Sequence, residues 1–289
     1  MSQDYRDIKT GEKGAVISII AYIFLSVIKL VIGTFSGSEA LRADGLNNTT
    51  DIIASVAVLV GLKISRKPPD EDHPYGHWRS EQVASLIASF IMMTVGLQVL
   101  YQAFLSVIGD RHQSPDWLSA WTALGAAVVM YGVYWYNRRL AEQVNSQSLM
   151  AAAKDNRSDA WVSIGAAVGI IGSQFGLPWL DPVTAIIVGL LICKTAWDIF
   201  KESSHRLTDG FDENQLTAYK QTIFRVPGVK EIGNIKARTY GSNVIVDVVI
   251  HVNPELDVKR SHDITQEVEK ALINQYDIMD AQVHVEPKE

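Results

Sequence analysis

Apolar segments long enough to cross a lipid bilayer recur six times before residue 201. A helix of about 20 apolar residues spans the hydrocarbon core, because each helical residue adds about 1.5 Å of length. The recurrence therefore predicts an α-helical membrane domain with six transmembrane helices. The segments are Ala15–Phe35, Leu46–Leu62, Val83–Ile108, Leu118–Tyr136, Ala151–Gly172 and Pro182–Ile199.

Two of these segments begin with a pair of polar residues four positions apart. Asn47 and Asp51 form the first pair, and Asp155 and Asp159 form the second. Residues four apart share one face of a helix. A charged side chain at the bilayer centre costs about 2.5–3.5 kcal/mol even on the lenient insertion scale, so such residues face the bundle interior. Two pairs aimed at one interior point predict a cation site; the alternative is that they cap helix starts or contact headgroup-level water.

The ligand atoms of these four residues are all oxygens. Oxygen ligands suit Mn²⁺ and Mg²⁺, whereas Zn²⁺ is usually held by Cys or His. Cys193 is the only cysteine, and it lies within an apolar segment, so the chain can build no thiolate site. Asp44, Asn48 and Asn156 lie next to the predicted ligands and are candidates for supporting roles.

The distribution of basic residues predicts the orientation of the chain. Lys and Arg gather in the polar N-terminal leader (residues 1–13) and in the connections after the second and fourth segments. The positive-inside rule then gives cytoplasmic N- and C-termini. The leader has no cleavage site of the signal-peptide type. The net charge of −6, without a basic block, argues against nucleic acid as a partner.

The chain after residue 205 has the pattern of a small soluble domain. We expect the elements α-β-β-α-β, which form an α+β open sandwich, and a division into a leader (1–13), a transmembrane domain (14–205) and a cytoplasmic domain (206–289). A domain of about 80 residues is short for an independent core, so dimerisation would stabilise it. The expected elements lie in Asp209–Arg225, Lys230–Tyr240, Val244–Val252, Val258–Ile273 and Asp280–Val285.

A second cluster of possible ligands lies in the loop after the second apolar segment. Its members could hold a divalent ion, and the alternative is a solvated turn without a metal. They are Asp70, Glu71, Asp72, His73 and His77.

A third cluster lies in the C-terminal domain. His284 and Glu286 alternate along one predicted strand and share a face, and His251 and His262 lie in neighbouring elements. The alternative is a set of unrelated surface histidines.

At these motifs the sequence resembles the cation diffusion facilitators, a family of dimeric divalent-metal/proton exchangers. The stretches ADGLNNTTD, HPYGH and DNRSD carry the resemblance, which covers nearly the whole chain. It implies six spans, a metallochaperone-like (ferredoxin-like) C-terminal domain, no prosthetic group, and metal ligands at Asn47, Asp51, Asp155 and Asp159. Zinc-transporting relatives place a histidine in one of these pairs, so this chain resembles the manganese-transporting branch.

The resemblance also implies a loop site at Asp70, His73 and His77. A charge pair of Arg79 and Asp209 would lock the third span to the start of the soluble domain.

In the C-terminal domain the resemblance is incomplete. His262, His284 and Glu286 match positions of a metal site in the family, but Gly233 and Val249 stand where a zinc-transporting member has histidines. His251 lies two residues from Val249 on the same face and is a candidate substitute.

We therefore expect a homodimeric exporter in the cell (inner) membrane that moves Mn²⁺ out of the cytoplasm in exchange for protons. Within the same family, the alternative is a Zn²⁺ or Fe²⁺ exporter. From a different class, the alternative is a membrane-anchored metal sensor, although a pure anchor has no use for acidic pairs inside its spans. The chain has no GxxxxGK[ST] motif and no apparent nucleophile–base pair, so we expect a secondary transporter and not an enzyme.

Overall fold

The computed structural model describes residues 3–109, 114–144, 147–240, 243–276 and 278–288. The first two residues of the predicted leader and the last residue of the predicted C-terminal domain lie outside these ranges. The chain divides into two compact units, Met1–Val56 with Ile87–Asp198 and Ala57–Leu86 with Ile199–Glu289.

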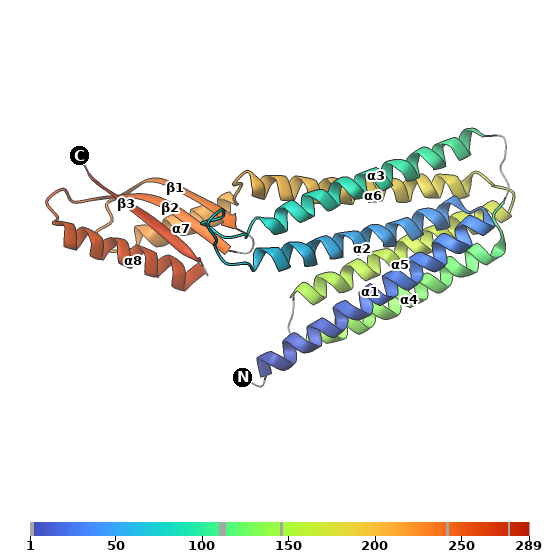
Figure 1. Ribbon diagram of the computed structural model, residues 1–289, viewed down its shortest axis with the longest axis horizontal. Coiled ribbons are helices and arrows are strands. Elements are labelled where there is room, and N and C mark those ends of the chain that lie inside the picture. The colour runs from blue at the N-terminus through green and yellow to red at the C-terminus, as the bar shows by residue number, and fades with distance from the viewer. Residues whose placement is uncertain (1–2, 110–113, 145–146, 241–242, 277, 289) are drawn as a thin grey trace. The chain divides into compact units, whose positions relative to one another are not determined.

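Six long helices form the first two thirds of the chain (Figure 1). By length and composition, five of them can cross a membrane; among the described residues, α5 does not meet this criterion. Four charged residues between positions 154 and 159 explain the difference, so the predicted fifth segment is helical but less apolar than expected. The helices are α1 (Gln3–Ser36), α2 (Glu39–Ser65), α3 (Ser80–Ile108), α4 (Trp117–Val144), α5 (Gln147–Gln174) and α6 (Leu180–Leu207).

Small side chains determine how the helices of the first unit pack. Helices α4 and α5 lie side by side, and α1 packs against α4 (Figure 1). Ala123 of α4 and Ala166 of α5 are fully buried in one cluster, together with Leu41 of α2. Small residues let helix backbones approach closely, which is how membrane helices associate when lipid is as apolar as their side chains.

The C-terminal part of the second unit is a three-stranded sheet with two helices. The strand order is β1-β2-β3, with β1 and β2 antiparallel and β2 and β3 parallel. The fold class predicted from the sequence, a helical membrane domain followed by a small α-β-β-α-β domain, is confirmed. The elements are α7 (Glu213–Phe224), β1 (Glu231–Tyr240), β2 (Asn243–Val252), α8 (Val258–Tyr276) and β3 (Asp280–Pro287).

One face of this sheet carries the core of the domain. Val246 and Ile250 of β2 are fully buried, and they share one hydrophobic cluster with Val268 and Leu272 of α8. Alternate residues of β2 therefore face α8, and the residues between them lie on the opposite face.

We predict that Leu272→Ala destabilises the C-terminal domain by about 2–5 kcal/mol, because it leaves a cavity in this core. Ile273→Ala is the matched control: the Ile273 side chain is 42% exposed on the same helix, so the loss of stability should be about 0.5 kcal/mol. Urea unfolding of a fragment that spans residues 206–289, followed by circular dichroism, measures both. Equal losses in the two variants would contradict the assigned core.

Candidate metal centre

Helix α1 carries a polar stripe through an otherwise apolar segment. Ser18, Tyr22, Ser26 and Lys29 follow one another at intervals of four, four and three residues, so they lie on one helix face. All four are buried, and Lys29 is fully buried. Sequence reasoning missed this stripe. The available signal was one lysine inside a segment with no other charge.

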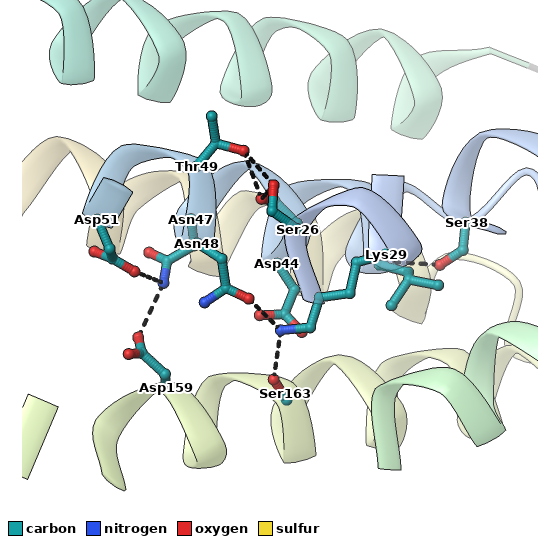
Figure 2. Close-up of polar contacts among 12 residues, drawn as sticks. Ser26, Lys29, Ser38, Asp44, Asn47, Asn48, Thr49, Asp51, Asp159 and Ser163 are labelled. Atoms are coloured by element: carbon teal, nitrogen blue, oxygen red, sulfur yellow. Dashed lines mark hydrogen bonds and ion pairs between the residues drawn. The ribbon is translucent and has the colours of Figure 1, made fainter. Parts of the chain in front are cut away.

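Three of the four predicted ligands lie together between α2 and α5. The Asn47 amide nitrogen donates to Asp51 Oδ2 at 3.4 Å and to Asp159 Oδ1 at 3.2 Å (Figure 2). The Asn47 amide thus lies between one carboxylate from α2 and one from α5. An ion that binds here would accept the amide oxygen of Asn47 together with oxygens of both carboxylates.

Asp155, the fourth predicted ligand, is exposed one turn before Asp159. In the described part of the chain, only one group of three His, Cys, Asp or Glu side chains has its ligand atoms all within 4.8 Å of one another, and Asp155 is not in it. The carboxylates of Asp51, Asp155 and Asp159 therefore do not surround one point in this structure. Asp155 lies at the accessible end of the site.

Tyr22 holds Asp159 in place from α1. Its hydroxyl lies 2.7 Å from Asp159 Oδ2 and 2.9 Å from Asn156 Oδ1, and because a phenol has one proton it donates to one of them at a time. The Asn156 amide nitrogen in turn donates to Ser18 Oγ at 3.1 Å. Asn156, a neighbour of the predicted ligands, thus takes part in orienting the site.

Lys29 forms a fully buried ion pair with Asp44, with 2.9 Å between Nζ and Oδ2. The ammonium also donates to Asn48 Oδ1 at 2.7 Å and to Ser163 Oγ at 2.9 Å (Figure 2). This Lys29 cluster, made of Lys29, Asp44, Asn48 and Ser163, joins α1, α2 and α5. Asp44 and Asn48, also neighbours of the predicted ligands, thus contact a lysine.

The formal charges of the interior fit a divalent cation. Lys29 pairs with Asp44, which leaves the carboxylates of Asp51 and Asp159 beside the Asn47 amide without an ion-pair partner among the described residues. Charges buried away from water require a partner of opposite sign. The arrangement can therefore bind a doubly charged ion through oxygen atoms.

The loop cluster is compact. The ligand atoms of Asp70, His73 and His77 all lie within 4.8 Å of one another, and the two imidazole centroids are 4.3 Å apart. Desolvation acts to raise the pKa of Asp70, but the hydrogen bonds from His73 and the nearby imidazoles together hold this pKa below its usual value. Asp70 and His73 are more than half exposed, whereas His77 is 14% exposed.

The candidate ligands of the C-terminal domain are only partly brought together. His251 and Glu286 are paired across β2 and β3, and His284 Nε2 lies 3.6 Å from Glu286 Oε1, so these three share one sheet face. His262 lies on α8, which packs on the opposite face, and it contacts Gln266.

Gly233 occupies an irregularity in the β1–β2 register, which shifts between Ile232 and Asn234. A Cβ atom at Gly233 would lie 2.6 Å from His251 Nε2. The imidazole of His251 therefore fills the space that a side chain at position 233 would need.

Arg79 and Asp209 form an ion pair through Nη2 and Oδ1. The Arg79 guanidinium also donates to the Leu207 carbonyl at 3.3 Å and lies 4.7 Å from the centre of the Tyr240 ring. Asp209 has a positive φ of 60°, which is uncommon outside glycine. Within the second unit, Arg79 thus ties the start of α3 to the residues between α6 and α7 and to β1.

The fold defines a polytopic membrane protein, and its helices bring together oxygen atoms that can bind a cation. Residues 15–208 match the cation efflux transmembrane domain, and residues 211–288 match the cation efflux protein, cytoplasmic domain. The chain belongs to the cation efflux family, a family of transporters, and the resemblance to cation diffusion facilitators is confirmed.

Several relatives match over most of their length. The chain is 60% identical to the manganese efflux system protein MneS of Bacillus subtilis, over 99% of this chain and 98% of the relative. It is 32% identical to the manganese efflux system protein MneP of the same organism, over 96% of each. It is 31% identical to the magnetosome protein MamM of Magnetospirillum gryphiswaldense, over 86% of this chain and 79% of the relative.

Among solved structures, the copper form of a MamM C-terminal domain is 29% identical over 27% of this chain and 76% of that chain, with a TM-score of 0.26. The sheet topology and the family match together identify the fold of the C-terminal domain.

We predict that Tyr22→Phe weakens divalent-metal binding by about 10–100-fold, the range typical for partners that orient a metal ligand. The change removes only the hydroxyl that contacts Asp159. Tyr101→Phe is the control, since Tyr101 is 64% exposed on α3. Titration of the purified protein with Mn²⁺ by calorimetry measures both variants. Wild-type affinity in Tyr22→Phe would show that this hydroxyl does not support the site.

Proposed function

We propose that this protein exports Mn²⁺ from the cytoplasm in exchange for protons, as a homodimer in the cell membrane with both termini in the cytoplasm. The observation that carries the proposal is the position of the Asn47 amide between Asp51 and Asp159. Together, these three side chains bring oxygen atoms from α2 and α5 to one place. Metal efflux follows from the family; the metal, the counter-ion and the orientation are proposed.

Manganese is favoured by ligand chemistry and by the relatives. The proposed ligands Asn47, Asp51, Asp155 and Asp159 offer only oxygen, which Mn²⁺ accepts and which Zn²⁺ accepts less readily than imidazole or thiolate. Two relatives that cover nearly the whole chain are named for manganese efflux. Zn²⁺ and Fe²⁺ are the competing cargoes.

Proton exchange follows from the chemistry of carboxylates in a dry interior. A carboxylate that binds a proton no longer carries the charge that holds a divalent ion. Proton entry from outside would therefore release the ion from Asp51, Asp155 or Asp159, and proton loss to the cytoplasm would restore the site. The proton gradient then drives the cycle without a nucleotide.

We propose that the C-terminal domain, from about residue 206, forms the dimer contact. A core of this size benefits from a partner surface. The Arg79–Asp209 pair would hold α3 to this contact, so that the helices around the transport site move against a fixed axis.

We further propose Asp70, His73 and His77 as a weak metal site at the surface. For His251, His262, His284 and Glu286 we expect weak metal binding or none, because their ligand atoms lie on two faces of the domain.

The direct test is metal uptake into inside-out vesicles with an imposed pH gradient. We expect Mn²⁺ uptake that depends on an acidic lumen and that Zn²⁺ inhibits only weakly. Uptake of Zn²⁺ or Fe²⁺ in preference to Mn²⁺ would favour the other cargoes. Binding of metal without any uptake would favour a membrane-anchored sensor.

We predict that Asp51→Ala lowers the rate of Mn²⁺ transport by more than about 100-fold, because the loss of a charged ligand exceeds the loss of a supporting contact. Asp198→Ala is the control: Asp198 lies exposed on α6 in a pair with Lys194, and exposed pairs contribute little. Vesicle uptake with matched protein levels compares the two. Near wild-type transport by Asp51→Ala would contradict the site assignment.

We predict that Asn47→His shifts selectivity toward Zn²⁺, because it adds an imidazole to an oxygen shell. Asn47→Ala removes the amide without adding a nitrogen, so it should lose Mn²⁺ transport and gain no Zn²⁺ transport. Uptake of both metals from an equimolar mixture gives the ratio. An unchanged Mn²⁺/Zn²⁺ ratio in Asn47→His would show that another feature determines selectivity.

A further inference from the structure

The Lys29 cluster lies directly next to the transport site and repeats its plan. Asp44 and Asn48 are four apart on α2, as are Asn47 and Asp51, and Ser163 follows Asp159 by four residues on α5. The cluster is thus displaced by about one helical turn, toward the N-terminus of α2 and the C-terminus of α5. Its oxygen atoms surround the Lys29 ammonium at 2.7–2.9 Å (Figure 2).

Exposure decreases along α5 toward this cluster. Asp155 is exposed, Asp159 is 7% exposed, and Ser163 is fully buried. Lys29, Asp44 and Asn48 are also fully buried. The transport site is therefore accessible from the side of Asp155 and closed on the side of the cluster.

The closure is tight because α1 and α2 approach each other at Gly45. A Cβ atom at Gly45 would lie 3.0 Å from the Lys29 Cβ and 3.0 Å from the Leu30 Cγ. A side chain at this position would require its neighbours on α1 to shift by a few tenths of an ångström, so glycine favours the close approach of the two helices. The Lys29 side chain is fully buried at this place, and a metal ion that moved beyond Asp159 would meet its positive charge.

Stability alone does not account for such a cluster. A buried ion pair contributes little compared with apolar side chains of the same volume. The cluster is also incompletely satisfied, since Asp44 Oδ1 has no hydrogen-bond partner among the residues that the structure describes. A buried carboxylate oxygen without a partner at the junction of three helices is free to accept a hydrogen bond in another arrangement of these helices.

We propose that the Lys29–Asp44 pair is the gate of the transport path on the side of the α1–α2 turn. In the state described here the pair is closed, and Lys29 blocks the ion. The pair separates when the site opens to that side, and the flexible stem of Lys29 withdraws the ammonium from α5. The proposal rests on the proposed function, because it concerns the path of the exported ion.

The test uses a thiol in the gate. Ser163→Cys, in a Cys193→Ser background, places a side chain of similar size against Lys29 and leaves no other cysteine. A membrane-impermeant, cationic thiosulfonate reagent is added outside sealed right-side-out vesicles loaded with Mn²⁺, because their outer face receives the exported ion. We expect labelling to increase about tenfold during Mn²⁺ transport relative to vesicles without Mn²⁺ or a pH gradient. A variant that transports Mn²⁺ without any increase in labelling would overturn the proposal.

A second variant tests the proposal if the Ser163→Cys variant does not transport Mn²⁺. Lys29→Met combined with Asp44→Asn removes both charges, so neither is left unpaired. If the pair is a gate, the double variant should bind Mn²⁺ with wild-type affinity and change the maximal transport rate about tenfold or more at an unchanged KM. If the pair only stabilises the fold, both binding and maximal rate should be those of the wild type, which would overturn the proposal.

The two proposals fail in different ways. If the wild-type protein does not move Mn²⁺, the proposed function is wrong. If the wild type moves Mn²⁺ and the double variant moves it at the same maximal rate, only the gate is wrong.

Discussion

Charge compensation inside the membrane bundle is the constraint on which the rest of the structure depends. Carboxylates on α2 and α5 are costly in an apolar interior unless a cation or hydrogen-bond donors accompany them. Helix α1 supplies both: Lys29 neutralises Asp44, and Tyr22 contacts Asp159. What remains is a pair of negative charges that one divalent cation can neutralise. The metal affinity that we propose for the interior would therefore follow from the charges that the protein itself leaves unpaired.

The fold was largely predictable because its signals are local. Helix lengths follow from apolar runs, and the C-terminal strands follow from alternation, as in β2, where every second residue from Val244 to Val252 faces inward. The four candidate ligands were also identified by their spacing. Pairing between helices was not predictable: the partner of Asp44 is Lys29, 15 residues away on another helix, and an isolated lysine in an apolar run carries no information about what it contacts. The exposure of Asp155 likewise depends on how α5 packs and not on its sequence.

The C-terminal domain shows how one backbone irregularity changes a possible metal site. The shift in register at Gly233 lets the imidazole of His251 enter the space above β1. A side chain at Gly233 and the present position of His251 exclude each other, so the two cannot both supply ligands in this arrangement. The sequence left open whether His251 substitutes for the histidine that is missing at Val249; the structure gives a steric reason why only one of positions 233 and 251 carries a side chain.

Binding of the cation between α2 and α5 through oxygen atoms can be tested directly. Pulsed electron paramagnetic resonance detects nitrogen nuclei bound to the metal when the protein is loaded with about one Mn²⁺ per chain. We expect an oxygen-only first shell without imidazole nitrogen coupling, and we expect Asp159→Ala to lose the signal of bound Mn²⁺. Coupling to imidazole nitrogen in the wild-type protein would place the tightly bound ion at the histidines of the loop or of the C-terminal domain, and would contradict the account.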